Sequence, residues 1–431
     1  MFPRVPLDDA NSTHSRRTGQ PGTAAPPSTL RCNPATAQKS PHVNRQTPNQ
    51  TVQSSRCKHS HPPRKNTSRT WQQRKLGELA NITSGKSVIS NQSHGAYAVL
   101  GSRGIIGHDD SYDYQGSFIL IARVGAHAGH MYHYVGKVKI SDNTIFLTSQ
   151  MISFLYCRLL AFNLKQLSFG TGQPLIKANE LKSLLLTVPP TSSEQERIVG
   201  FFCVLDDLIA AAKKKADLLK LKKKYYLQAI FSQRLRFKGF TKPWQQRKLE
   251  ELCIRVGSGG TPSVQHPEYY NGKIPFLGIS DLSGRAVSAT QKKITQRGLD
   301  NSAAWLVPKG SITLAMYASV GKVAILDIEL ATSQAFFNMV IPEETCIRDF
   351  LFSRLEKADI CHEWLPLIST GTQPNLNAAK LKDWELKVPS TQERKTIGEF
   401  FHALDDLAAA LARKIELLER RKTAYLQRLF V

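Results

Sequence analysis

Residues 198–230 read IVGFFCVLDDLIAAAKKKADLLKLKKKYYLQAI, and residues 397–429 read IGEFFHALDDLAAALARKIELLERRKTAYLQRL. In both stretches, alternating steps of four and three residues meet apolar or aromatic side chains at nine of ten positions, and the tenth is a lysine at the same step. This spacing is the heptad seam of paired helices. The main seam residues are Ile198, Phe202, Leu205, Ile209, Leu219 and Tyr226 in the first stretch, and Ile397, Phe401, Leu404, Leu411, Ile415, Leu418 and Tyr425 in the second.

The two seams are expected to pack on each other. A helix of this length spans roughly 50 Å, and its narrow apolar stripe needs a partner with the same spacing. Two amphipathic helices on separate cores are the alternative. The seam lysines, Lys223 and Lys422, either fix the register as polar seam residues or, as we favour, lay their stems on the seam with the ammonium in water.

The segments beside these helices repeat too. WQQRKLGEL (71–79) returns as WQQRKLEEL (244–252), and GTGQPLIKANELKSLLLTVP (170–189) matches TGTQPNLNAAKLKDWELKVP (370–389). We interpret each closing stretch as a polar loop, a short helix and a strand. Between opening and closing stretches lie short strand-like runs with Gly and Asn turns, which predict mixed α/β domains. Their middles diverge, and the first is the shorter.

The predicted fold is therefore α/β, with two globular mixed α/β domains separated by two long antiparallel coiled-coil helices in an internal pseudo-two-fold repeat. The antiparallel orientation follows because domain termini usually lie close together, and the second domain joins the end of one helix to the start of the other. The expected segments are a first domain (71–191), a helix with its linker (192–243), a second domain (244–389) and a second helix (390–431).

Residues 1–70 are expected to be a disordered, basic tail rich in Pro, Ser and Thr. They hold ten of the 22 prolines, only six Leu, Ile, Val or Phe residues, and a net charge of +9. Such a composition buries too little apolar surface to offset the entropy of ordering.

Charge points to a polyanionic partner. The chain carries +24 in all, of which +15 lies in residues 71–431, so nucleic acid is expected ahead of a membrane. No apolar run approaches the roughly 20 residues of a spanning helix, and no signal peptide opens the chain. We therefore expect a cytoplasmic protein.

The sequence offers no persuasive catalytic or metal-binding constellation. Seven scattered cysteines never form CxxC, so no structural zinc site is expected. His127, His130 and His133 are spaced as a helical ligand stripe, but Gly125 and Gly129 favour a turn and a strand. DWELK (383–387) has the residue types of a nuclease cluster, yet the matching residues of the first copy are Ser-Leu-Leu-Leu-Thr, so we interpret it as an amphipathic strand.

These motifs, in their doubled order, resemble the DNA specificity subunits of type I restriction–modification enzymes. The resemblance covers residues 71–431 and includes RFKGFTKPW (236–244) between the repeats, which has no counterpart before Trp71. It implies two target recognition domains, each reading half of a split double-stranded DNA site. It also implies a chain that is not an enzyme and needs no cofactor itself. The implied partners are methyltransferase subunits, two in the favoured stoichiometry, and restriction/translocase subunits, which use S-adenosylmethionine, ATP and Mg²⁺.

Candidate DNA-contacting residues fall in two groups. The closing loops offer polar and basic side chains, and the divergent middles offer Lys and Arg for phosphates and base edges. A purely structural role for the closing loops, and simple solvation of the basic residues, are the alternatives. The candidates are Thr171, Gln173, Lys177, Thr372, Gln373 and Asn375 in the loops, and Arg103, Arg123, Arg285, Lys292 and Lys293 in the middles.

Two other functions stay open on residues alone. A bipartite DNA-binding regulator without enzyme partners would share the same fold and charge. A self-sufficient nuclease would have to use Glu385 or Lys387 of DWELK.

Overall fold

The computed structural model describes residues 70–88, 94–168, 174–282, 284–343, 346–369 and 375–430. The chain divides into two compact units, and each takes one part of each long helix: unit 1 comprises Met1–Asp207 with Arg420–Val431, and unit 2 comprises Leu208–Glu419. The predicted tail lies outside the described residues, apart from Thr70. Within the described ranges, no helix has the length and apolar character needed to cross a bilayer.

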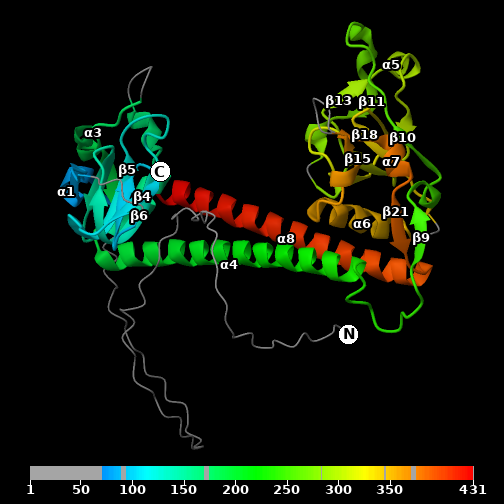
Figure 1. The fold of residues 1–431 in the computed structure, drawn as a ribbon. Helices are drawn as coiled ribbons and strands as arrows, with labels where there is room; N and C mark the ends of the chain where they lie inside the picture. Colours follow the sequence, from blue (N-terminus) through cyan, green and yellow to red (C-terminus); the bar gives the residue numbers. More distant parts are fainter. Residues whose placement is uncertain are drawn as a thin grey trace, which may run out of the picture. The chain divides into compact units, whose positions relative to one another are not determined.

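The two repeated stretches form the long helices α4 (Ser192–Phe231) and α8 (Thr391–Phe430), 40 residues each (Figure 1). Both begin after a hydroxyl residue. The Thr191 and Ser390 side chains each accept a hydrogen bond from the backbone N–H three residues on, at 3.4 Å, which satisfies one of the free donors of the first turn. A glutamate in each first turn complements the positive end of the helix dipole.

Within each unit the helices run antiparallel, as predicted. In unit 1, Phe202 of α4 stacks near Phe430 of α8 with ring centroids 6.3 Å apart, while four residues further along α4 Asp206 meets Lys422. In unit 2, Lys213 pairs with Glu419, and further along α4 Phe231 stacks on Phe401. Within each unit, contacts at higher residue numbers in α4 are therefore made by lower residue numbers in α8, which is the pattern of antiparallel helices.

Most predicted seam residues are buried or half-buried, and Tyr425 is the exception. Its side chain is 43% exposed, whereas Leu426 and Phe430 are 7% and 5% exposed and form the seam at that end of α8. An α-helix has 3.6 residues per turn, so a strict 3.5-residue pattern drifts round its surface over successive turns. The buried members are Ile198, Phe202, Leu205, Ile209, Leu219, Ile397, Phe401 and Leu411, and the half-buried ones are Tyr226, Leu404, Ile415 and Leu418.

The two seam lysines are paired, which corrects our preference for solvated ammonium groups. Lys223 lies 2.5 Å from Asp405 of α8, and Lys422 lies 2.6 Å from Asp206 of α4. The lysine side chains are only 16% and 18% exposed. Because the two aspartates occupy equivalent places in the LDDL motifs, the pairs form a repeated polar device that fixes the helix register.

Unit 1 is built on a six-stranded sheet of order β2-β7-β5-β6-β3-β4. Buried runs such as TIFLT form its middle strands, and the apolar face covers a core shared with α2 and the ends of the long helices. Its elements are β1 (Gln72–Lys75), α1 (Leu76–Leu79), β2 (Asn81–Ser84), β3 (Tyr97–Gly101), β4 (Gly104–Asp109), β5 (Tyr114–Ala122), β6 (Met131–Ile140), β7 (Thr144–Thr148), α2 (Ile152–Ala161), α3 (Ala178–Ser183) and β8 (Leu185–Val188).

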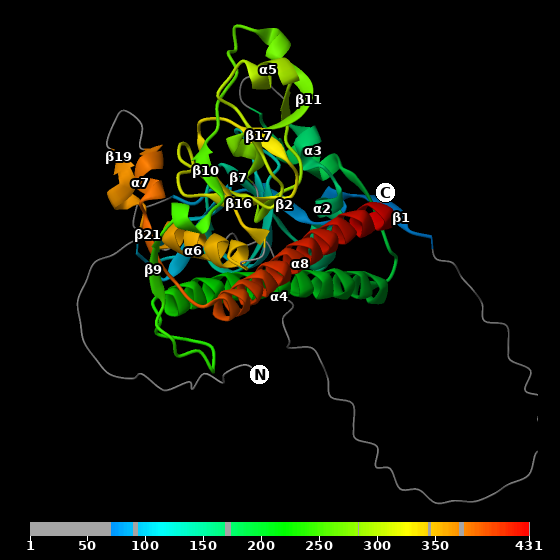
Figure 2. The ribbon, with the colours of Figure 1, turned by 90° about the vertical axis from the view of Figure 1, so that its right-hand side faces the viewer.

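Unit 2 has a five-stranded sheet of order β10-β18-β15-β16-β12 and a second, four-stranded sheet of order β13-β11-β17-β14. Helix α6 lies between the sheets and the paired helices (Figures 1 and 2). The elements are β9 (Gln245–Lys248), β10 (Arg255–Ser258), β11 (Tyr270–Leu277), β12 (Ala286–Val287), β13 (Lys292–Ile294), α5 (Gln296–Asp300), β14 (Leu306–Val307), β15 (Ile312–Ala315), β16 (Val323–Leu326), β17 (Leu330–Thr332), β18 (Phe336–Val340), α6 (Arg348–Ile360), β19 (Ile368–Ser369), β20 (Asn375–Leu376), α7 (Ala378–Lys382) and β21 (Glu385–Val388).

The repeated opening and closing motifs pair with each other. Strand β1 pairs antiparallel with β8, with Gln72 opposite Val188, and β9 pairs with β21, with Gln245 opposite Val388. The predicted loop, short helix and strand of each closing stretch are confirmed by α3 and β8 and by α7 and β21. Each repeated frame therefore closes its own domain immediately before a long helix begins.

An aromatic cluster joins each domain to the helices, and the two clusters are equivalent. In unit 1, Phe430 lies 6.0 Å from Trp71 and 5.7 Å from Phe154 of α2. In unit 2, Phe231 lies 6.3 Å from Trp244 and 5.4 Å from Phe350 of α6. The repeated Trp and the repeated final Phe are therefore structural residues that anchor a domain to its helix ends.

Candidate nucleic-acid interface

The closing loops meet the central sheet at the same place in both units. In unit 1 the backbone N–H of Ile176 donates to the carbonyl of Arg123 at 2.9 Å, just past the end of β5. In unit 2 the N–H of Leu376 donates to Met316 at 3.0 Å, just past the end of β15. Thr171, Gln173, Thr372 and Gln373 belong to these loops but lie outside the described residues.

In unit 1 this contact gathers basic side chains from three segments. The turn after β5 is tied to the closing loop by Gly125 N–H to Pro174 at 3.0 Å. The same turn packs on residues 164–167 so closely that a Cβ on Gly129 would lie 2.9 Å from the backbone of Lys165. Arg123 is half-buried, and Lys165 and Lys177 are exposed. Because backbone contacts join the segments that carry these three cations, we call the three residues the basic edge.

The turn that carries Arg103 is linked to the turn after β5 through the connection between β6 and β7. Arg103 is exposed in the turn between β3 and β4. The β6–β7 connection touches both regions, because the Ser141 N–H donates to Leu100 and the Asn143 carbonyl accepts from the Arg123 N–H. The Tyr132 hydroxyl also donates to the Gly101 carbonyl at 2.5 Å, and burial raises the pKa of this hydroxyl, so it stays a neutral donor there.

In unit 2 the turn after β15 is strained. Ala318 and Ser319 have φ angles of 31° and 70°, a region that residues with a side chain rarely adopt. Gly321 follows, packed against Asp359 and Trp364. Such strain persists only where the surrounding structure enforces it, and it is frequent at functional sites. This turn follows β15 as the turn with Arg123 follows β5, so the two turns are counterparts.

Among the other candidates of unit 2, Asn375 directly precedes Leu376, whose backbone N–H donates to Met316 at the start of this turn. Lys292 and Lys293 are exposed on β13, an edge strand of the second sheet, where lysine also discourages edge-to-edge association. Asn375 is half-buried on β20, paired with Ser369 of β19.

Arg285 is engaged inside the protein. Its guanidinium pairs with Asp349 and lies 2.8 Å from Asp405, and it stacks on the Phe352 ring at 4.3 Å. Asp405 also accepts Lys223, whose ammonium reaches Glu356 at 2.7 Å. Burial raises the pKa of Glu356 in spite of that lysine. These contacts give Arg285 a structural role, and its guanidinium is not among the DNA contacts that we propose.

The DWELK motif, whose residue types are those of a nuclease cluster, makes side-chain contacts within its own domain. DWELK leads into β21, where Glu385 accepts from Gln246 at 2.5 Å and Asp383 pairs with Lys248. Burial raises the pKa of the Cys157 and Cys253 thiols to about 12 each, so neither is a thiolate at neutral pH.

The three spaced histidines fall on a turn and a strand, as expected. His133 is on β6, where a ring nitrogen lies 2.8 Å from the Ser117 hydroxyl, and burial lowers its pKa. Among the residues that the structure describes, no group of three or more His, Cys, Asp or Glu is placed to hold a metal ion.

The position of Lys165 could not be predicted, because no pattern in the sequence indicates that residues 164–167 fold against the turn after β5. Sequence reasoning also missed the pairing of Trp71 with Glu194, whose carboxylate accepts the indole N–H at 2.9 Å. The missing leader before Trp71 was the one signal in the sequence for a difference at that place.

The class of protein follows from the comparisons. The family model described as the type I restriction modification DNA specificity domain matches residues 68–221 and again residues 241–420. The two matches together cover well over half of the chain, and the chain therefore belongs to this family.

Individual relatives agree. A segment of 183 residues is 32% identical to the type I restriction enzyme MjaIX specificity subunit of Methanocaldococcus jannaschii, covering 42% of each chain. A segment of 170 residues is 25% identical to the HindI specificity subunit of Haemophilus influenzae, covering 38% of this chain and 37% of the relative. The matched segments thus span less than half the length of these curated relatives.

Solved structures share the fold. The S subunit of a type I restriction–modification system from M. genitalium matches with a TM-score of 0.57 at 16% identity, over 85% of this chain and 98% of that one. A chain from a structure on complex assembly and conformational transition of the type I R-M system gives a TM-score of 0.52 at 17% identity, over 86% and 98%. The predicted mixed α/β domains with antiparallel long helices are confirmed as the family fold.

Proposed function

We propose that this chain is the DNA-recognition subunit of a type I restriction–modification assembly and that its two domains, 71–191 and 244–389, each read one half of a bipartite site. The observation that carries the proposal is the doubled family match, once over each domain. The excess of 58 Lys and Arg over 34 Asp and Glu supports a polyanionic partner.

The basic edge of unit 1 is the proposed point of approach to DNA. Arg123, Lys165 and Lys177 contact phosphates there, which positions the domain without reading sequence. Base edges are read by the segments that differ between the units, together with the closing loops 169–173 and 370–374. In unit 2, Lys292 and Lys293 supply phosphate contacts, and Asn375 with the strained turn after β15 lies beside the closing loop.

The catalytic steps belong to partners. We propose that the chain itself is not an enzyme and docks two methyltransferase subunits and the restriction/translocase subunits in the cytoplasm. S-adenosylmethionine, ATP and Mg²⁺ are bound by those subunits. The linker and helices, 192–243 and 390–431, serve as the spacer between half-sites.

A domain exchange tests the reading of half-sites. Residues 80–190 are replaced by the equivalent segment of another family member, the chain is assembled with its methyltransferase subunits, and the methylated sites on a random DNA library are sequenced. One half-site should change and the other should stay. The matched control exchanges residues 254–388 and should change the opposite half. A change in both halves from either exchange contradicts the proposal.

Helix length tests the spacer separately. Insertion of one heptad into each long helix, after Lys213 in α4 and before Leu411 in α8, adds about 10 Å to the pair. The gap between half-sites should lengthen by about three base pairs at 3.4 Å each. Methylation at the original gap would contradict a spacer role and leave the domain assignment intact.

A further inference from the structure

In unit 2 the linker after α4 fills a groove at the helix ends. Both Arg236 nitrogens that face Glu393 donate to its carboxylate, at 3.0 and 2.7 Å, and Glu393 is only 2% exposed. The next residue, Phe237, packs edge-on against Phe400 with centroids 5.5 Å apart. Leu235 is fixed by its backbone N–H, which donates to Ala229 at 3.0 Å. An Arg–Phe pair of the linker thus occupies the groove.

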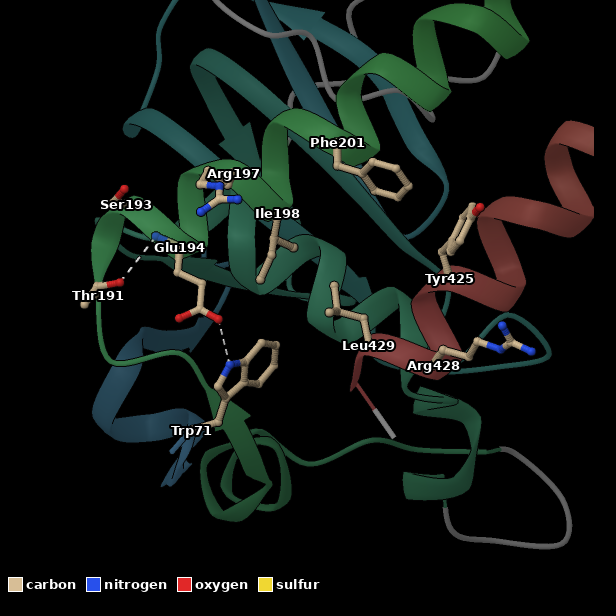
Figure 3. Close-up of a pocket in the computed structure, with 10 residues that line it drawn as sticks. All are labelled: Trp71, Thr191, Ser193, Glu194, Arg197, Ile198, Phe201, Tyr425, Arg428 and Leu429. Carbon is tan, nitrogen blue, oxygen red and sulfur yellow. Dashed lines mark hydrogen bonds between the residues drawn. The ribbon is translucent and has the colours of Figure 1, made fainter. Parts of the chain in front are cut away.

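Unit 1 has the same groove with its walls exposed. The equivalents of Trp244, Glu393 and Phe400 are Trp71, Glu194 and Phe201, and they line a groove of about 650 Å³ together with Tyr425, Arg428 and Leu429 (Figure 3). Figure 3 shows Phe201 of α4 and Tyr425 of α8 pointing toward one another, with centroids 5.2 Å apart.

The exposed fractions of equivalent side chains differ between the two grooves. Phe201 and Tyr425 are 45% and 43% exposed, whereas their equivalents Phe400 and Tyr226 are half-buried. Leu429 is 38% exposed, and its equivalent Ile230 is 2% exposed. Paired aromatic rings left open at a helix junction are typical of an interaction site.

The carboxylates also differ in a consistent way. Glu393 is taken by Arg236, and the Trp244 indole N–H is buried with no hydrogen-bond partner among the described residues. Glu194 has no such arginine in the described part of the chain and accepts the Trp71 indole N–H instead. The arginine and the indole are therefore alternative partners of one carboxylate.

The residues before Trp71 lack the chemistry of the linker. Arg236 and Phe237 stand eight and seven residues before Trp244, and the corresponding places before Trp71 hold Pro63 and Arg64. Phe2 is the only Phe, Tyr or Trp in residues 1–70. The segment next to Trp71 therefore supplies no ring to cover Phe201, and a second polypeptide is the source that the groove favours.

We propose that the groove of unit 1 is a docking site for an extended segment of a second protein that carries an Arg–Phe pair. The guanidinium binds Glu194 in a charge-assisted, bidentate bond, and the ring packs on Phe201 and Tyr425. Arg197 and Arg428 flank the groove where unit 2 has Thr396 and Ala229, so acidic residues beside the Arg–Phe pair strengthen binding. This inference does not depend on DNA reading.

Peptide binding to the full chain tests the proposal. The probes are the chain's own 234–242 sequence, RLRFKGFTK, and the same peptide with Arg234 and Lys238 replaced by Glu, each measured by fluorescence anisotropy. Both should bind, the acidic version several-fold more tightly at low salt. Peptides with Arg236→Ala or Phe237→Ala should bind at least 10-fold more weakly. No binding of either parent peptide overturns the proposal.

Protein variants separate the groove from other surfaces. Phe201→Ala and Glu194→Gln should each weaken the parent peptide about 10-fold, and Glu194→Gln should leave the affinity of the Arg236→Ala peptide unchanged. Val135→Ala, at another exposed apolar side chain of unit 1, is the matched control and should bind normally. Equal binding by the groove variants and the parent protein, or competition of duplex DNA for the groove through Arg197 and Arg428, would sink the idea of a protein partner.

Discussion

Units 1 and 2 share a frame and differ in what the frame carries. The strand order β2-β7-β5-β6 of unit 1 has its equivalent in β10-β18-β15-β16 of unit 2. The match extends to a fifth strand, because β3 pairs in parallel with β6 and β12 pairs in parallel with β16. Beyond this common core, unit 1 adds β4, and unit 2 adds a separate four-stranded sheet. The repeated motifs lie beside the long helices in both units, and the segments that differ between the units lie between those motifs in the sequence.

The largest expected effect tests whether equivalent core residues contribute equally to the stability of the two units. Phe202→Ala and Phe401→Ala each remove a ring that is almost fully buried, at 1% and 0% exposure, and should each cost about 3–5 kcal/mol. Hydrogen exchange of the helical amides around Phe202 in α4 and around Phe401 in α8 resolves the two sites within one molecule. A cost more than about 2 kcal/mol larger at one site would break the equivalence, because it would approach the whole spread seen for such truncations.

The lysine pairs should be unequal. Lys422→Met leaves Asp206, 6% exposed, without its ammonium partner and should cost about 3 kcal/mol. Lys223→Met should cost less, because Asp405 keeps Arg285 at 2.8 Å and because burial raises the pKa of Glu356, the other partner of Lys223, toward the neutral acid. The comparison is made by denaturant unfolding followed by hydrogen exchange. Lys213→Met, in a pair about half exposed, is the control, with an expected effect under about 1 kcal/mol.

Substitution of the proposed phosphate contacts should change the salt dependence of DNA binding, whereas substitution of the ion-paired Arg285 should not. Arg123→Ala or Lys177→Ala should weaken binding of the assembled complex uniformly across sequences and lower the salt dependence by about one phosphate contact each. Arg285→Ala should lower stability and leave the salt slope unchanged, because its guanidinium already bridges two carboxylates. Titration of duplex DNA at several salt concentrations decides, and a reduced slope for Arg285→Ala would contradict its structural role.

The smallest effect concerns pH. Burial lowers the pKa of His133 in unit 1, so its contribution to stability is present above the unfolded-state pKa of about 6.5 and is lost as pH falls through the lower folded value. Unit 1 should lose under about 1 kcal/mol between about pH 7.5 and 5.5. His133→Gln, which can keep the hydrogen bond to Ser117, should remove this slope in thermal unfolding. An unchanged slope would place the titrating group elsewhere.

Sequence predicted what periodicity and repetition control. The heptad spacing predicted α4 and α8, and the order of the segments along the chain predicted that the two helices run antiparallel. The matching motifs predicted the closing helix and strand of each domain. The lysine pairs were not predicted, because which carboxylate meets Lys422 depends on helix register. Burial of Leu426 in place of Tyr425 depends on helical drift along the whole of α8. The basic edge depends on how three separated segments pack, and no local pattern encodes the position of Lys165.

The core of unit 1 contains Leu426 and Phe430, which follow the whole of unit 2 along the chain. During synthesis, the domain that leaves the ribosome early therefore waits for these residues before its core is complete, while unit 2 holds all of its own helix partners between Leu208 and Glu419. A late frameshift or stop codon would thus damage the domain encoded first and spare the one encoded second.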